Sequence, residues 1–331
     1  MTNIANQVVV EAKEKKEHLS LAIYIGTVII ASALLLVGFG LLKFFNEHRF
    51  APVNMGLAGA LGQQRPYVLF IGSSHTRQTY QINVIEEQLH QPAFLIAYDG
   101  TDLIAISQIL HQLCARPTSC PRAVIVEAYC AFLGRTPDME DPRYFFDAPP
   151  SLKKQIIAEY LKDHPSFGSK LNIFDLVMNR GNEALVTYPI NRQVLASLSY
   201  HGGISPNVIT PGLSQAAFDQ LHGANIPDGP NAEQVKAAHE IIAFARSRNI
   251  QFMFIESPLP GPVSRDVHIQ NLKRSFRNLA DSEHAPYLDG DMGFPIDDPR
   301  MFKDNNHLST LGRIAFTNRI VPVLRQEFNL P

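Results

Sequence analysis

The chain has 331 residues, of which 45% are hydrophobic and 18% are charged, so it can bury one large core or two modest ones. Its 29 basic and 31 acidic residues nearly cancel, and charge therefore gives no reason to expect a nucleic-acid partner. The 23 prolines favour long ordered loops over a helical bundle.

An apolar run near the N-terminus predicts a transmembrane helix. Residues 19–42 contain no charged side chain, and as a helix they would extend for about 36 Å, enough to span a bilayer. A cleaved signal peptide is the alternative, but its apolar core would be shorter. We therefore expect a cytoplasmic segment over 1–18, a membrane helix over 19–42 and a juxtamembrane linker over 43–65.

Basic residues on either side of this run set its expected orientation. Three lysines lie before it, at positions 13, 15 and 16, while Lys43 and Arg49 lie after it. The positive-inside rule then favours, by a small margin, a cytoplasmic N-terminus. Residues 66–331 are accordingly expected to form a domain outside the cytoplasm.

From residue 66 onward, apolar runs alternate with amphipathic stretches, which is typical of a parallel sheet with crossover helices. Strands are expected at 67–72, 93–97, 123–126 and 251–255, and a weaker one at 286–288. Helices are expected near 81–90, 102–113, 231–247 and 266–280, and at the C-terminus to about 328. The predicted fold class is α/β, with a doubly wound parallel sheet.

The alternation stops over 131–230, a stretch rich in aromatic residues and loop formers. Helical patches are expected within it near 151–162 and 213–221. An insertion of this size in an α/β domain is more often a functional cap than a passive loop. The sequence leaves open whether it is a lid, a docking surface or both.

The three cysteines lie within one short stretch. Cys114, Cys120 and Cys130 lack the paired spacing of a zinc site, so no metal is expected. Cys114 and Cys120 bracket a turn-like loop that could close as a disulfide in an oxidising compartment. Three free cysteines that pack in the core are the alternative.

Gly72-Ser73-Ser74 follows the first predicted strand and is a candidate nucleophile turn. Ligands of open α/β sheets bind at the carboxyl ends of the strands. A serine in a tight turn before a helix also has backbone N–H groups beside its hydroxyl group. The same three residues are ordinary turn formers, so the pattern alone does not decide between the two roles.

Asp304 and His307 supply a candidate base near the C-terminus. Three residues apart in a loop, the carboxylate can hydrogen-bond one ring nitrogen and leave the other facing outward. A serine hydroxyl needs such a base within hydrogen-bond reach. The alternative is a loop-and-cap role, in which Ser309 caps the last helix.

Gly72-Ser73-Ser74 and Asp304-x-x-His307-Leu308 resemble the first and last blocks of the SGNH (GDSL-like) hydrolase superfamily. The similarity spans roughly 66–325 and is closest to membrane-anchored bacterial proteins of surface-polymer acylation, such as the alginate O-acetylation proteins and the D-alanyl-lipoteichoic acid protein. The resemblance implies a flavodoxin-like sheet. It also implies that Ser74 is the nucleophile, His307 the base and Asp304 its orienting carboxylate, with Ser74 and Gly100 as backbone oxyanion donors.

Two positions depart from the family pattern. Ser73 stands where an aspartate usually precedes the nucleophile. No Gly-x-Asn-Asp block follows the third predicted strand, where residues 126–129 read Val-Glu-Ala-Tyr. The asparagine oxyanion donor is therefore missing or supplied by another part of the chain.

Other polar residues lie close to these blocks in the sequence or in the predicted fold. His75 is expected to line the site or contact substrate, and Arg77 to bind an anionic substrate or pair with an acid such as Glu86. Glu256, at the end of the fourth predicted strand, is expected as a specificity residue or a helix-capping acid. His201-Gly202-Gly203 is expected to be a flexible turn rather than an oxyanion loop.

These features together predict a membrane-anchored extracytoplasmic serine acyltransferase that works without a cofactor. The resemblance implies acetyl transfer to a cell-surface polysaccharide or glycolipid, a multi-spanning acyltransferase partner and a location on the bacterial cytoplasmic membrane. Hydrolysis by the same residues, as in an esterase or deacetylase, is one alternative. A non-catalytic scaffold that binds polymer or a membrane partner is the other.

Overall fold

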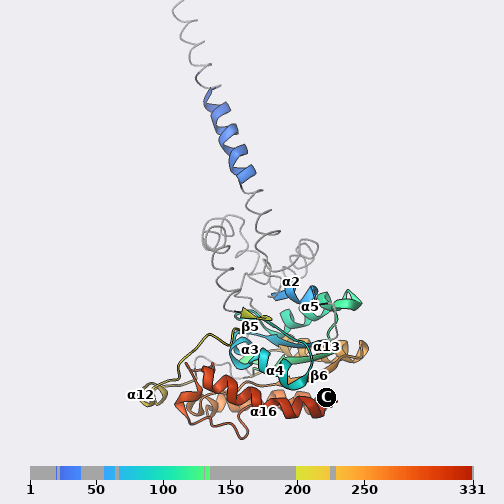
Figure 1. Ribbon diagram of the computed structural model, residues 1–331, viewed down its shortest axis with the longest axis vertical. Helices are drawn as coiled ribbons and strands as arrows, with labels where there is room; N and C mark the ends of the chain where they lie inside the picture. The colour runs from blue at the N-terminus through green and yellow to red at the C-terminus, as the bar shows by residue number, and fades with distance from the viewer. Residues whose placement is uncertain are drawn as a thin grey trace, which may run out of the picture. The chain divides into compact units, whose positions relative to one another are not determined.

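The computed structural model describes residues 20, 23–38, 56–63, 67–129, 131–134, 199–223 and 229–329 (Figure 1). The chain divides into two compact units, 1–51 and 52–331. In the first, residues 23–38 are helical. Among the described residues no helix is both long and apolar enough to cross a membrane, and the span expected over 19–42 lies partly outside them.

The second unit is built on a five-stranded parallel sheet in the order β2-β1-β3-β6-β7. Its strands are β1 Val68–Gly72, β2 Ala93–Ala97, β3 Ala123–Glu127, β6 Gln251–Ile255 and β7 Tyr287–Leu288. This is the strand order of the flavodoxin-like folds, and β1 lies beside the point where the order reverses. The predicted α/β class and parallel sheet are confirmed.

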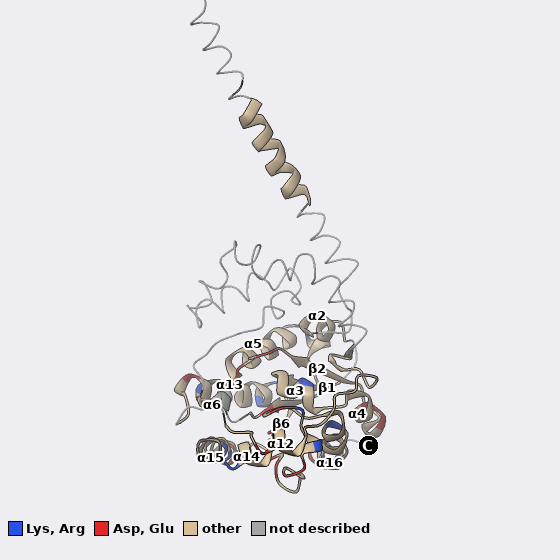
Figure 2. Ribbon diagram, turned by 90° about the vertical axis from the view of Figure 1, so that its left-hand side faces the viewer, with Lys and Arg blue, Asp and Glu red and all other residues tan. Residues whose placement is uncertain are grey.

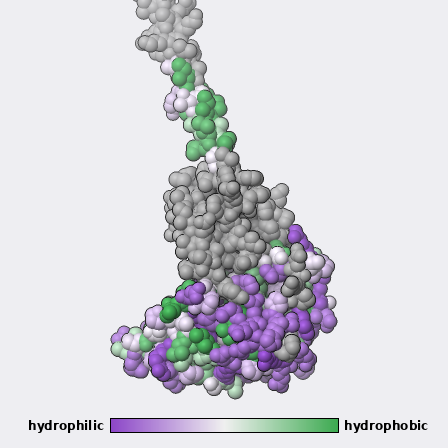
Figure 3. Space-filling view, viewed as in Figure 1, coloured by the Kyte–Doolittle hydropathy of each residue, from purple (hydrophilic) through white to green (hydrophobic). Residues whose placement is uncertain are grey.

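Helices cover both faces of the sheet, because alternate residues of each buried strand point in opposite directions. Leu69 and Ile71 of β1 belong to one core cluster, while Val68 and Phe70 belong to the other. The first cluster packs under α2 Gly56–Leu61, α5 Leu103–Cys114, α13 Ala232–Ser247 and α15 Val267–Ser282. The second packs under α4 Ile82–Leu89 and α16 Thr310–Phe328 (Figure 2). The visible described surface is largely hydrophilic, with smaller apolar patches (Figure 3).

The described residues include elements that the sequence does not predict, among them the helix α2 and a short helix after β1. Residues 56–61, expected within a linker, form α2, because Leu57 and Ala60 share a helix face and are fully buried. A further helix, α3 Ser74–Thr79, follows β1 directly, before α4. Its sequence has no apolar periodicity, and it begins where the Ser73 hydroxyl accepts a hydrogen bond from the His75 N–H group.

The insertion is described only at its two ends. Residues 135–198 and 224–228, which include the helical patch expected at 151–162, lie outside the described residues. The described parts are α6 Ala131–Gly134, the hairpin of β4 Ser199–Tyr200 and β5 Gly203–Ile204, and the short helix α12 Gln215–Phe218 within the expected patch at 213–221.

The segment 199–214, which we call the return segment, is tied to two parts of the domain. At its start the N–H group of Leu95 in β2 donates to the His201 carbonyl at 2.9 Å. Gly202 has a φ of +86° and lies so close to the Leu95 carbonyl that a β-carbon would collide with it. Near its end the N–H group of Thr310 donates to the Thr210 carbonyl at 3.0 Å. The His201 turn is thus part of a docked hairpin.

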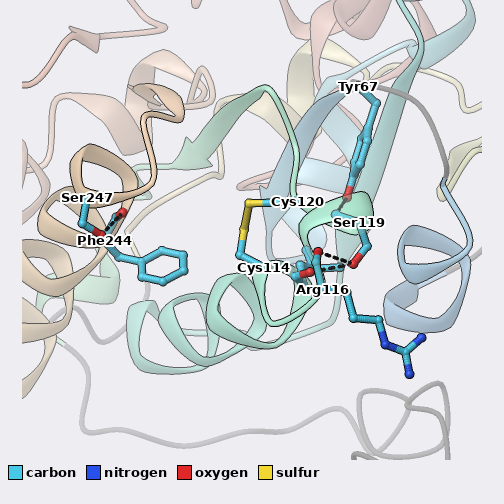
Figure 4. The surroundings of a disulfide bond; sticks show 8 residues. Tyr67, Cys114, Arg116, Ser119, Cys120, Phe244 and Ser247 are labelled. Carbon is cyan, nitrogen blue, oxygen red and sulfur yellow. Dashed lines mark hydrogen bonds between the residues drawn. A yellow bond between two sulfur atoms is a disulfide. The ribbon is translucent and has the colours of Figure 1, made fainter.

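Cys114 and Cys120 form a disulfide, which decides between the two alternatives left open by the sequence (Figure 4). The bond closes the loop between α5 and β3, around the short helix η1 Pro117–Ser119. Ser119 adds to this closure, because its hydroxyl donates to the Leu113 carbonyl at 2.6 Å and its own carbonyl accepts from the Tyr67 hydroxyl at 3.0 Å.

Loss of the disulfide should lower stability. Closure of a loop this short is worth about 2 kcal/mol through the unfolded state, so Cys120→Ser should lower the free energy of unfolding by about that amount. Urea denaturation of the purified full chain measures the change. A reducing agent should weaken the wild type similarly and leave the variant unchanged; equal stability of wild type and variant would contradict the assignment.

Candidate active site

Ser74 is the first residue of α3 and is separated from the inner strand β1 only by Ser73. All five residues of β1 are buried, so the strand end is held firmly against its neighbours. Gly72 permits the close turn into the helix, because a β-carbon there would collide with the Thr76 hydroxyl and the Glu127 β-carbon. The tight turn expected around Gly72-Ser73-Ser74 is therefore present, and it places Ser74 at the carboxyl edge of the sheet.

His307 lies in the loop between η3 Pro299–Met301 and α16. The loop is held by its own backbone, since the Lys303 N–H group donates to the His307 carbonyl at 3.0 Å and Phe302 forms a bridge with Leu308. Ser309 caps α16 by accepting from the Gly312 N–H group at 3.1 Å. The cap expected at Ser309 thus coexists with an accessible His307 ring.

Asp304 orients the imidazole of His307. Both carboxylate oxygens lie 3.0 Å from Nδ1, and Oδ1 also accepts from the backbone N–H groups of His307 at 2.8 Å and Asn306 at 3.0 Å. Because an ionised carboxylate only accepts, Nδ1 carries the proton and Nε2 is left as an acceptor.

Burial works to raise the pKa of Asp304, but His307, the Asn306 N–H group and Lys303 outweigh it and lower the pKa to about 2. The orienting carboxylate is therefore ionised throughout the neutral and mildly acidic range.

A hydrogen bond joins the candidate nucleophile to its base. The Ser74 hydroxyl lies 2.9 Å from Nε2 of His307, within the range expected for a nucleophile and its base. With the proton of His307 on Nδ1, the serine hydroxyl donates to Nε2. Ser74, His307 and Asp304 therefore form a continuous chain that can remove a proton from the serine as it attacks a carbonyl carbon.

The backbone donors expected for an oxyanion lie at the same edge of the sheet. Ser74 opens α3, and the first N–H groups of a helix have no partner within it. Gly100 follows the neighbouring strand β2 with a φ of +69°, in a turn closed by the bond from the Thr101 N–H group to the Tyr98 carbonyl. Their role as oxyanion donors stays a prediction.

Glu127 occupies the strand-end position where the resemblance would place an asparagine block. Its carboxylate accepts from the Thr76 hydroxyl at 2.9 Å and from the Ser257 hydroxyl at 2.9 Å and N–H group at 3.2 Å. The side chain is thus turned toward α3 and the segment after β6. The missing asparagine has no counterpart in Glu127.

Two of the other residues singled out in the sequence, His75 and Arg77, have side-chain partners within the chain. His75 is 3% exposed, and its ring stacks on Tyr129 with centroids 3.9 Å apart and lies 5.0 Å from the His307 ring. Arg77 donates to Asp99 at 2.5 Å, so it pairs with a surface acid, as one of the two expectations had it. Substrate contact by His75 and Arg77 stays a prediction.

The expected role of Glu256 as a specificity residue or a helix-capping acid stays a prediction. Glu256 is fully buried, accepts from the Tyr287 hydroxyl at 2.7 Å and lies 3.6 Å from the ammonium of Lys273. The carboxyl end of β6 faces the site, but the side chain points into the interior. The sequence predicts that Glu256 follows the end of the strand, but it does not predict the direction of its side chain.

Glu127 is the buried acid that the sequence interpretation left without a role. Burial raises its pKa to about 7, against the opposing hydrogen bonds from Thr76 and Ser257, and the nearby Glu256 raises it further. The sequence does contain a signal for this residue. An acid ends the apolar run Ala-Val-Ile-Val, and a carboxylate is rare in a buried strand.

No known family and no curated protein matches the sequence. Solved structures that resemble the chain include TesA, with 12% identity over 79% of this chain and 99% of that chain at a TM-score of 0.40. The acetyl xylan esterase AlAXEase matches with 12% identity over 78% and 99% at 0.40, and a GDSL-like lipase from Bacteroides thetaiotaomicron VPI-5482 with 9% over 85% and 98% at 0.37. At such identities and TM-scores these similarities assign no function to this chain.

The buried carboxyl group of Glu127 makes stability depend on pH. In the unfolded chain it loses its proton near pH 4.5, but in the folded chain only near pH 7, so its contribution to stability is lost as pH rises through this window. From pH 5 to pH 8 the free energy of unfolding of the wild type should fall by about 2 kcal/mol more than that of Glu127→Gln. Urea denaturation at both pH values measures this difference.

The control is Glu240→Gln on α13, where the side chain is 52% exposed and the same formal charge is removed. It should follow the pH dependence of the wild type. An identical pH dependence for wild type and Glu127→Gln would show that the carboxyl group titrates alike in the folded and unfolded chain.

Proposed function

We propose that this chain is an SGNH-type serine enzyme that cleaves or transfers acyl esters through an acyl-serine intermediate. The observation that carries the proposal is the hydrogen-bonded series of Ser74, His307 and Asp304, with the serine at the carboxyl edge of a parallel sheet. Residues from opposite ends of the domain meet there at catalytic distances. Folding alone does not require a hydroxyl, an imidazole and a carboxylate to be hydrogen-bonded in series.

The geometry supports a two-step reaction. In the first step the Ser74 Oγ attacks the ester carbonyl carbon while its proton moves to Nε2 of His307. We expect the N–H groups of Ser74 and Gly100 to stabilise the oxyanion. His307 then gives the proton to the departing alcohol, which leaves the acyl group on Ser74. In the second step His307 takes the proton of an incoming hydroxyl as its oxygen attacks the acyl carbon. The bond from the acyl carbon to the Ser74 Oγ then breaks, and His307 returns the proton to that oxygen.

A carbohydrate hydroxyl as the incoming group would make the enzyme an acyltransferase, and this is the finer form of the proposal. We propose O-acetyl transfer to a cell-surface polysaccharide or glycolipid, outside the cytoplasm and with a multi-spanning membrane partner that supplies the acyl donor. The Cys114–Cys120 disulfide supports an oxidising compartment, and the uncharged run 19–42 supports membrane attachment.

Two alternatives use the same fold. With water as the incoming group the same residues give an esterase or deacetylase. A non-catalytic scaffold that binds polymer or a membrane partner is favoured by one observation, the replacement of the expected asparagine block by Glu127, Ala128 and Tyr129.

Ser74 should react with a fluorophosphonate probe. Because His307 Nε2 accepts the serine proton, mass spectrometry of the labelled full chain should find the adduct on Ser74, and His307→Ala should slow labelling at least about 100-fold. Ser74→Ala should abolish labelling, while the control variant Ser247→Ala, at an exposed serine on α13, should retain it. A wild type that is folded by circular dichroism and unlabelled would favour the scaffold.

Transfer and hydrolysis differ in their product. Incubation of the full chain with p-nitrophenyl acetate and a neutral oligosaccharide should yield acetylated sugar, with little excess acetate over the Ser74→Ala control. Acetate alone, at the same rate of p-nitrophenol release, would support the esterase and exclude transfer to that acceptor. Mass spectrometry of the sugar and an acetate assay distinguish the two.

A further inference from the structure

Glu127 ends β3, the strand beside β1, and its side chain is 1% exposed. The carboxyl group lies under α3 and beside the segment that follows β6. A buried carboxylate is costly unless hydrogen bonds or a cation compensate for its lost hydration. Three hydrogen bonds, from α3 and from the segment after β6, offset part of this cost at Glu127.

The hydrogen bonds connect α3 to the sheet at two points. Thr76 donates to Oε2 of Glu127 at 2.9 Å, and Thr79, at the end of α3, donates to the Ser257 hydroxyl at 2.8 Å. Ser257 in turn donates its hydroxyl to the same Oε2 at 2.9 Å and its N–H group to Oε1 at 3.2 Å. Thr76 is therefore hydrogen-bonded to Glu127 directly, and Thr79 is connected to it through Ser257.

The helix that carries the nucleophile depends on such anchors. It has six residues, Ser74–Thr79, and a helix of this length is not stable without tertiary contacts. Ser74 is its first residue, two positions before Thr76. A shift of α3 would move the Ser74 hydroxyl from its position 2.9 Å from His307, and misplacement by about 1 Å can cost about 100-fold in rate.

We propose that Glu127 is a positioning residue for Ser74: through Thr76, and through Ser257 and Thr79, it fixes α3 so that the serine hydroxyl meets His307. This inference rests on the proposed function for its effect on rate. The anchoring of α3 itself can be observed whether or not the chain is an enzyme.

The test compares Glu127→Gln, Thr76→Val and the double variant in the full chain. Glutamine can still accept from the Ser257 N–H group, but its amide group then faces the Thr76 and Ser257 hydroxyls, whose hydrogen bonds to the side chain must break or reverse. With p-nitrophenyl acetate at pH 8, where Glu127 is ionised, each single variant should lower kcat about tenfold and leave KM unchanged. The double variant should lose less than the product of the two single losses, because both substitutions alter the hydrogen bond between Thr76 and Glu127.

The matched control is Tyr287→Phe, which removes a hydrogen bond to another buried carboxylate, that of Glu256, on the next strand. It should keep the kcat of the wild type. Losses that multiply in the double variant, an equal loss in Tyr287→Phe, or an unchanged kcat in Glu127→Gln would each overturn the assignment.

Hydrogen exchange gives a readout that needs no activity. The amides of residues 74–79 should exchange about tenfold faster in Glu127→Gln and Thr76→Val than in the wild type or Tyr287→Phe. If the wild type neither turns over the ester nor is labelled at Ser74, the proposed function fails while faster exchange still supports the anchor. Unchanged exchange at 74–79 overturns the role of Glu127 in either case.

Discussion

The hydrogen bond between Ser74 and His307 joins residues 233 positions apart, so it can form only if the whole domain is correctly assembled. β1 fixes one end, and α16, which packs on the same face of the sheet as α4, fixes the other. The contact from the Gln81 N–H group to the Thr317 hydroxyl, at 2.9 Å, locks α16 to the start of α4. A small shift of α16 would therefore change the distance between His307 and Ser74.

Two buried acids at the ends of neighbouring strands are stabilised in different ways. Glu127 receives neutral donors from Thr76 and Ser257, whereas Glu256 receives a hydroxyl and lies near the buried ammonium of Lys273. The pKa of Lys273 is raised despite its burial, because acids including Glu256 surround it. The ion pair with Lys273 holds Glu256 in a rigid part of the interior. Neutral hydroxyl donors hold Glu127 against α3, so no counter-ion is needed beside Ser74.

The sequence predicts the sheet better than it predicts the site. The runs at 93–97 and 251–255 match β2 and β6 residue for residue, because uninterrupted apolar strands leave little choice of boundary. Helix α3 escapes prediction, since capping and tertiary hydrogen bonds, not periodicity, form it. The pairing of Ser74 with His307 follows from topology, but the directions of Glu127 and Glu256 depend on packing that neither strand encodes alone.

The return segment has a consequence for how the domain behaves among its own copies. An open sheet edge offers unpaired N–H and C=O groups to any other strand, and is a common starting point for aggregation. At β2 the hairpin places the His201 carbonyl on the Leu95 N–H group, and at the opposite edge β7 is only two residues long. Both edges of the sheet therefore offer few unpaired backbone groups to a strand of another molecule, which disfavours edge-to-edge association of the described core.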